Sequence, residues 1–293
     1  MIKNYLEVYS FMKKILSILL MLIFFIPTYA IPKYQIKNDI LYENEKRATG
    51  TFEITYDNLK IKVQYINGLM NGICEVYDSE DDIIMKALCK NNEFFKTEVF
   101  YKNGELMSFE LKDKNNIINE YYLKNGKKIM SSNKNKRENI LYHENGKRLL
   151  VTISNVIKIY NEKEELLFEA NNGEVVDIGF RTEELNDGSV NFLKGNLVVA
   201  NLDKEAEFLT FLYSTGEEML KIDEDYRIKE ILFKDGTTFL KEEKGRVIMN
   251  HKDGNLFYEM IGESINIYDN DGEEIMTRIY TNFPEIAEIK RVK

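Results

Sequence analysis

Asn-Gly and Asp-Gly pairs recur along this chain at nearly regular intervals. The glycines of these pairs and of one Thr-Gly pair stand at positions 104, 126 and 146, and again at 216, 236 and 254. The step between them, about 20 residues, is the length of a β-hairpin, which needs two strands of about six residues and two short connections. Asn-Gly and Asp-Gly also supply the positive φ angles of a two-residue type I′ turn. The spacing therefore predicts a chain of repeated hairpins.

The predicted turns are formed by glycines and the Asn or Asp residues that precede most of them. They are Asn67, Gly68, Asn71, Gly72, Asn103, Gly104, Asn125, Gly126, Asn145, Gly146, Gly216, Asp235, Gly236, Asp253, Gly254, Asp271 and Gly272. The flanking segments alternate as strands do, because Met107, Phe109 and Leu111 fall on one face. We expect an all-β fold, an elongated antiparallel meander of hairpins. The alternative is a closed β-propeller-like array, since two hairpins per blade also fit a period of about 40 residues.

The N-terminal segment over 1–30 has the layout of a secretory signal peptide. A short basic stretch at 12–14 precedes an apolar run over 15–26, and small residues at 28 and 30 mark a cleavage site. Met12 is an alternative start. An uncleaved membrane helix is the competing interpretation, but the run is shorter than the roughly 20 residues that span a bilayer. We expect an exported protein, in the periplasm, at the cell surface or secreted, with no integral membrane segment after cleavage.

The repeats divide the rest of the chain. We predict an N-terminal linker over 31–47, repeats over 48–170, divergent repeats or a seam over 171–200, degenerate repeats over 201–280 and a C-terminal tail over 281–293. Segment 202–213 is interpreted as strand because its apolar residues directly precede a glycine turn. In the tail, a short helix is expected after Pro284.

The stretch from residue 48 to residue 77 resembles the MORN-variant repeats of bacteria. It contains Gly50, then Tyr65-Ile-Asn67-Gly68, then Asn71-Gly72, and Gly72 follows Gly50 by the same interval as Gly126 follows Gly104. Units of that family, grouped as YwqK-type antitoxin-like proteins, read roughly as Gly, strand, Tyr-Tyr-x-Asn-Gly-Lys, strand, Gly. In later repeats the final Gly is mostly missing, and the chain has no Trp. The resemblance implies a hairpin array and, as one function, neutralisation of a toxin.

Tyrosines near the turns form a candidate aromatic binding face. They are Tyr65, Tyr77, Tyr101, Tyr122 and Tyr142. Rings in rows either pack on one another or anchor a partner. The chain has two cysteines, Cys74 and Cys89. Export would permit a disulfide between them, and two buried free thiols in adjacent strands fit the sequence equally well.

The charge of the chain argues against nucleic acid as a partner. The net charge is −9, and removal of the leader, which carries +2, leaves −11. An acidic protein repels phosphate backbones.

No motif for phosphate binding, nucleophilic catalysis or zinc hydrolysis occurs, so we expect no cofactor and no metal. Acidic pairs at 81–82, 164–165 and 183–184 are the basis of a third hypothesis, a glycan-active enzyme, which ranks last. The sequence favours a non-catalytic repeat protein that binds a protein or cell-envelope component. An antitoxin or immunity protein is the alternative.

Overall fold

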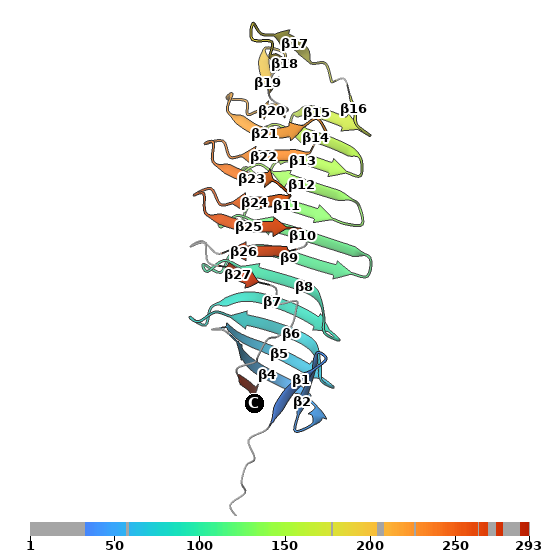
Figure 1. Cartoon of the computed structure of the whole chain (residues 1–293), viewed down its shortest axis with the longest axis vertical. Helices are drawn as coiled ribbons and strands as arrows, with labels where there is room; N and C mark the ends of the chain where they lie inside the picture. Colours follow the sequence, from blue (N-terminus) through green and yellow to red (C-terminus); the bar gives the residue numbers. More distant parts are fainter. Residues whose placement is uncertain are drawn as a thin grey trace, which may run out of the picture. The chain divides into compact units, whose positions relative to one another are not determined.

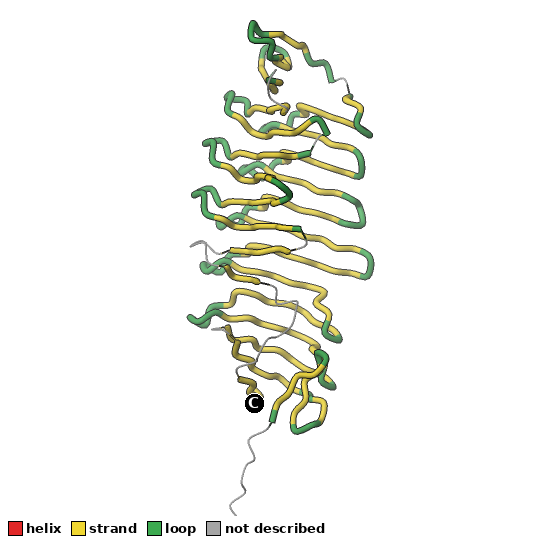
Figure 2. The backbone as a smooth tube through the Cα atoms, viewed as in Figure 1, coloured by secondary structure: helices red, strands yellow, loops and turns green. Residues whose placement is uncertain are grey.

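The computed structural model describes residues 33–56, 59–176, 178–203, 208–225, 227–262, 264–268, 274–277 and 288–292. All regular secondary structure in these ranges is β-strand (Figures 1 and 2). The all-β prediction is therefore confirmed. Within the same ranges no helix is long and apolar enough to cross a membrane. The predicted signal peptide and the predicted turn at Asp271 and Gly272 lie outside the described residues.

The chain divides into two compact units, Met1–Arg47 and Ala48–Lys293. The first unit contains a three-stranded antiparallel sheet of β1 (Tyr34–Lys37), β2 (Ile40–Glu43) and β3 (Lys46–Arg47). Its turns use Asn38-Asp39 and Asn44-Glu45, all with positive φ. The predicted linker over 31–47 is thus a small sheet in its described part, because these Asn-containing pairs supply hairpin turns without glycine.

In the second unit, the chain from residue 50 to residue 175 forms one meander, which we call the long sheet. Its strands are β4 (Gly50–Tyr56), β5 (Leu59–Ile66), β6 (Leu69–Tyr77), β7 (Ile83–Lys90), β8 (Glu93–Phe100), β9 (Leu106–Asp113), β10 (Asn116–Tyr122), β11 (Lys128–Asn133), β12 (Glu138–Tyr142), β13 (Arg148–Ile153), β14 (Val156–Tyr160), β15 (Leu166–Asn171) and β16 (Glu174–Val175). Each strand pairs antiparallel with the next along the chain, as a hairpin array predicts.

A second meander, the short sheet, follows in the chain. Its strands are β17 (Arg181–Glu184), β18 (Val190–Lys194), β19 (Leu197–Leu202), β20 (Phe208–Leu212), β21 (Glu218–Asp223), β22 (Ile228–Leu232), β23 (Thr238–Glu243), β24 (Arg246–Asn250), β25 (Leu256–Ile261), β26 (Ser264–Tyr268) and β27 (Glu274–Thr277). Neither sheet closes into a barrel or propeller, since each runs as an open series of sequential neighbours. The chain passes from one sheet to the other between β16 and β17, within segment 171–200.

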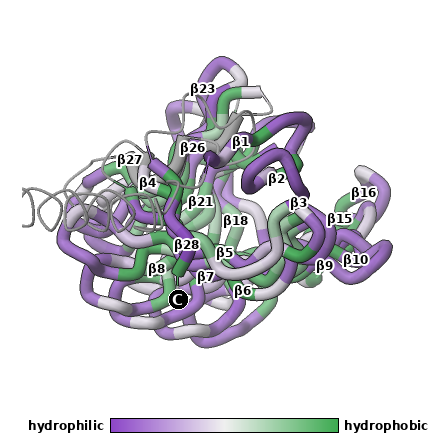
Figure 3. Tube along the Cα trace, turned by 90° about the horizontal axis from the view of Figure 1, so that it is seen from below, coloured by the Kyte–Doolittle hydropathy of each residue, from purple (hydrophilic) through white to green (hydrophobic). Residues whose placement is uncertain are grey.

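The two sheets pack against each other through one apolar face each. The ring of Tyr121 in β10 lies 6.3 Å from Phe257 and 5.8 Å from Tyr258, both in β25. Phe168 in β15 meets Phe211 in β20 with ring centroids 5.4 Å apart. Viewed from below, hydrophobic positions gather toward the inside of this unit and hydrophilic ones along its turns (Figure 3). Successive side chains of a strand point to opposite faces, so each sheet has one apolar face and one polar face. Packing the two apolar faces together removes both from water.

The C-terminal tail adds a strand where a helix was expected. Strand β28 (Glu288–Val292) pairs antiparallel with β4 and becomes the outermost strand of the long sheet beside it. Arg291 donates from Nη2 to the carbonyl oxygen of Thr49 at 2.8 Å, and its guanidinium lies 5.3 Å from the Phe52 ring. Pairing with β4 covers an edge that would otherwise expose unpaired backbone groups. Residues 281–287 lie outside the described part.

Most glycine turns differ from the predicted two-residue type. At Gly104 the amide donates to the carbonyl of Tyr101, and the Tyr101 amide donates to the carbonyl of Glu105. This is a three-residue loop, in which a type I turn is followed by a residue with left-handed φ. The same two bonds recur at Gly126, Gly146, Gly216, Gly236 and Gly254. The Asn or Asp before most of these glycines has no positive φ. At Asn103, for example, the side chain accepts a bond from the amide two residues later.

The type I′ prediction does fit Asn67-Gly68, where φ is 53° and 79° and Ile66 pairs with Leu69. Asn71 and Gly72 were predicted as a turn and instead lie inside β6. Gly72 has a φ of 97°, and a Cβ there would collide with the side chain of Gln64. The pairing of β5 with β6 is irregular next to Gln64, so a bulge places its side chain over the glycine.

Candidate functional site

The residue just before each of the six three-residue turns named above points inward, and we call it the anchor position. It lies three residues before the turn glycine and is occupied by Tyr101, Leu123, His143, Tyr213, Phe233 and His251, all buried. The hydroxyl of Tyr101 donates to the carbonyl of Tyr122 at 2.6 Å. Tyr213 donates in the same way to Leu232 at 2.9 Å. Anchors thus join one repeat to the next, and Tyr101 is not available to a partner.

His143 makes the same connection with an imidazole. Its Nε2 lies 3.0 Å from the carbonyl oxygen of Tyr160, so Nε2 carries the proton, and Nδ1 has no hydrogen-bond partner among the described residues. The ring is 4% exposed and lies 5.8 Å from that of Tyr213 across the two sheets. Burial lowers the pKa of His143, outweighing the hydrogen bond to Tyr160 and the charge of Glu162.

A depressed histidine pKa makes stability depend on pH. The unfolded chain binds this proton more readily than the folded one, so stability is complete above the ordinary value of about 6.5 and falls as pH drops below it. Between pH 7.5 and 5.5 we expect the loss to be on the order of 1 kcal/mol in urea denaturation. His143→Tyr keeps a donor for Tyr160, as at Tyr101, and should flatten this slope. An unchanged slope in that variant would exclude His143 as its source.

A row of aromatic side chains near the ends of alternate strands forms what we call the aromatic ladder of the long sheet, and three of them stand one residue before an anchor. Its members are Tyr77, Phe100, Tyr122, Tyr142 and Tyr160. They occupy alternate strands, β6, β8, β10, β12 and β14. Because neighbouring strands are about 4.8 Å apart, successive rings stand roughly 10 Å apart. All but Tyr160, which is 9% exposed, are half-buried, so ring faces and edges reach the surface.

Charged side chains order the ladder. Lys60 lies 4.9 Å from the Tyr77 ring, Lys128 lies 5.7 Å from Tyr122, and Arg148 lies 4.8 Å from Tyr160. Such cation–π contacts favour the observed position of these three rings.

Tyr122 shows how a ladder ring also hydrogen-bonds to the charged side chains beside it. Its hydroxyl and the Lys128 ammonium both donate to Glu120, and these bonds hold the pKa of that carboxyl below its usual range although burial opposes them. Of the predicted aromatic face, Tyr77, Tyr122 and Tyr142 belong to this surface. Tyr65 does not: it is 2% exposed and packs edge-on against Phe52.

The two cysteines lie in adjacent strands as free, buried thiols. Cys74 in β6 pairs with Ala87, and Cys89 in β7 pairs with Gly72, so the thiols are diagonal neighbours. Their mutual hydrogen bond and burial raise the pKa of Cys74. The Cys74 thiol therefore stays protonated and unreactive at neutral pH.

The acidic pairs considered for catalysis lie in three separate places. Asp81 and Asp82 belong to the loop between β6 and β7, Glu164 and Glu165 to the loop between β14 and β15, and Glu183–Glu184 to the exposed strand β17. Among the described residues no group of three or more His, Cys, Asp or Glu side chains could hold a metal ion.

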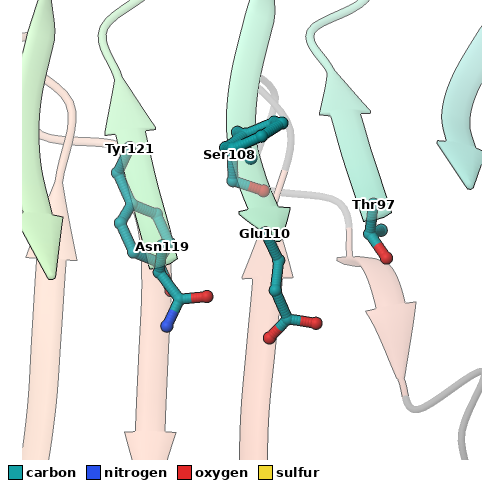
Figure 4. A pocket seen from close by; sticks show the side chains of 6 residues that line it. Thr97, Ser108, Glu110, Asn119 and Tyr121 are labelled. Atoms are coloured by element: carbon teal, nitrogen blue, oxygen red, sulfur yellow. The ribbon is translucent and has the colours of Figure 1, made fainter. Parts of the chain in front are cut away.

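A small polar pocket lies on the inner face of the long sheet, at strands β8, β9 and β10 (Figure 4). It is lined by Thr97, Ser108, Phe109, Glu110, Asn119 and Tyr121 and has a volume of about 100 Å³. The strand register places Thr97 opposite Glu110, Glu110 opposite Asn119, and Ser108 opposite Tyr121. Polar side chains from three neighbouring strands therefore meet beside the ring contacts between the sheets.

The polar groups of the pocket are only partly paired. Thr97 is 7% exposed, and its hydroxyl has no hydrogen-bond partner in the described part of the chain. Glu110 pairs through Oε1 with the Lys112 ammonium at 2.9 Å, and Asn119 donates from Nδ2 to Ser132 at 3.4 Å. Burial, with smaller effects of Tyr258 and Glu110, raises the pKa of Tyr121, which therefore keeps its proton.

Sequence reasoning did not find this pocket or two of the ladder rings, Phe100 and Tyr160. The ladder could be recognised in part from the sequence, since Phe100, Tyr122 and Tyr142 each stand one residue before an anchor. The pocket had a weaker one. Thr97, Glu110 and Asn119 are polar residues at inward positions of alternating strands, and only the register shows that they are neighbours.

No protein-family model matches the chain, and no curated protein matches it. Among solved structures, it is similar to the wild-type TCP10 domain of CPAP from Danio rerio, determined in complex with a peptide of Danio rerio STIL. The identity is 12%, the match covers 78% of this chain and 99% of that chain, and the TM-score is 0.20. A likeness of that size says nothing about what this chain binds.

Proposed function

We propose that this is an exported, non-catalytic repeat protein of the MORN-variant type that binds a protein or cell-envelope component through the aromatic ladder. The observation that supports the proposal is the regular row of partly exposed rings on the long sheet. Aromatic side chains contribute large contact area at a low cost in conformational entropy, and they dominate binding energies at many interfaces. Basic neighbours contact the rings of Tyr77, Tyr122 and Tyr160 before any partner binds, which lowers that cost further for these three.

The ladder is the surface to change in a test. In the triple variant Tyr77→Ser, Tyr122→Ser and Tyr142→Ser, we expect the affinity for a partner captured from envelope extract and then purified to fall by about 100-fold or more. Each truncated ladder ring should cost roughly 1–2 kcal/mol of binding free energy. Titration calorimetry with the purified partner measures the change.

Tyr268 offers a matched control. It is a half-buried tyrosine of the short sheet whose hydroxyl donates to Glu259 at 2.9 Å, much as Tyr122 does to Glu120. Tyr268→Ser should bind the partner normally. If the triple variant binds the partner as tightly as the unaltered protein does, the partner binds at another surface. If the unaltered protein captures no partner, the proposal is overturned.

A further inference from the structure

We propose that the pocket lined by Thr97, Glu110 and Asn119 is a binding site for a protonated primary amine. It opens on the inner side of the long sheet, whereas the aromatic ladder lies on the outer side. The inference is therefore independent of the proposed function, and either can fail without the other.

The acceptors of the pocket include a carboxylate oxygen, which favours a cationic donor. The pairing of Glu110 with Lys112 uses Oε1 and leaves Oε2 for another donor. Asn119 uses its Nδ2 on Ser132, which leaves Oδ1 as an acceptor, and the Thr97 hydroxyl is unpartnered within the described ranges. These three acceptors come from three adjacent strands, with Glu110 between the other two (Figure 4). An ammonium group has three donors and no acceptor, so it can bond the Glu110 carboxylate and an acceptor beside it. Thr97 and Asn119 lie on either side of Glu110, about 10 Å apart at the backbone, so the ammonium bonds one of them at a time.

The charge and size of the site agree with that ligand. A carboxylate bonded to a cation forms a charge-assisted hydrogen bond, which is about twice as strong as a neutral one. The volume of about 100 Å³ equals the share of roughly three water molecules in the liquid. An ammonium head with a short alkyl stem fits this space. The Tyr121 ring supplies an apolar wall for the stem, next to the buried rings of the short sheet.

The test is NMR titration of the full chain with ethylammonium chloride at constant ionic strength. We expect saturable shifts of the Thr97, Glu110 and Asn119 backbone amides at millimolar ligand. Tetramethylammonium has the same charge and no donor, so it should cause no saturable shift. A peptide carrying one lysine then separates two sources of the ligand. Tighter binding than ethylammonium indicates a partner's side chain, and weaker binding indicates a free amine; both support an amine site.

Three variants sharpen the test. Glu110→Gln keeps the shape and removes the charge, and it should weaken ethylammonium binding by about tenfold or more. Lys112→Met removes a competing ammonium and should strengthen binding severalfold, which a purely structural role of the pocket would not produce. Glu120→Gln is the matched control, a glutamate of the same sheet that is paired with Lys128 on the opposite face. It should bind as the unaltered protein does.

Thermal denaturation confirms that each variant is folded. The proposal is overturned if tetramethylammonium shifts the same amides as strongly, if Lys112→Met binds no better, or if no saturable shift appears, in which case the pocket holds water only.

Discussion

A chain that ends at Val176 is expected not to fold. It would keep β4 to β16 and lose the short sheet that covers the apolar face of these strands, together with the edge strand β28. Leu150 and Ile159 are 2% and 0% exposed in the full chain, and Phe168 is 5% exposed. Each such side chain gains roughly 1.5–3 kcal/mol from burial. Exposing several of them removes more free energy than the roughly 5–15 kcal/mol by which a typical domain is stable.

The comparison is made on purified chains by circular dichroism and binding of a hydrophobic dye. The shortened chain should aggregate or bind the dye strongly and show no cooperative urea transition. Addition of a second fragment covering 178–293 should restore a cooperative transition, since it returns the missing layer. A shortened chain that unfolds cooperatively as a monomer would show that the long sheet is stable as a single layer.

That second layer is the part of the fold that the repeats could not predict. Hairpins are local, so turn glycines spaced by the length of one hairpin were enough to place the strands and their antiparallel order. An alternating pattern says that one face is apolar, but it does not say what covers that face. The contact of Phe168 with Phe211 joins strands β15 and β20, which belong to different sheets. No pattern among neighbouring residues of the sequence predicts such a contact. The strand at Glu288–Val292 was missed for the same reason, because its partner β4 lies at the other end of the unit.

The aromatic face shows a different kind of error, a displacement of one residue. Tyr101 stands three residues before its turn glycine, whereas Tyr122 and Tyr142 stand four before theirs. A shift of one residue in a strand moves a side chain to the opposite face. Tyr101 is therefore an internal anchor, and its neighbour Phe100 occupies the ladder. Counting from the glycine would have separated the two sets. The turn type was misjudged because Asn-Gly serves both kinds of hairpin.

Phe211→Ala is expected to cost about 3–5 kcal/mol of unfolding free energy, the range for emptying a large aromatic site in a core. Phe211 is 1% exposed, lies on the apolar face of the short sheet, and meets Phe168 of the long sheet edge-on. Urea denaturation measures the loss. The control is Phe95→Ala on the long sheet, where the ring is 39% exposed and the expected cost is below about 1 kcal/mol.

A double-mutant cycle with Phe168→Ala tests whether this cost belongs to the contact between the layers. Aromatic pairs contribute about 0.5–1.5 kcal/mol beyond the area they bury, so the double variant should lose less than the sum of the single losses by that amount. Additive losses would mean that the two rings do not stabilise each other. In that case this ring pair would not hold the two sheets together. The expectation that a chain ending at Val176 does not fold would then lose its physical basis.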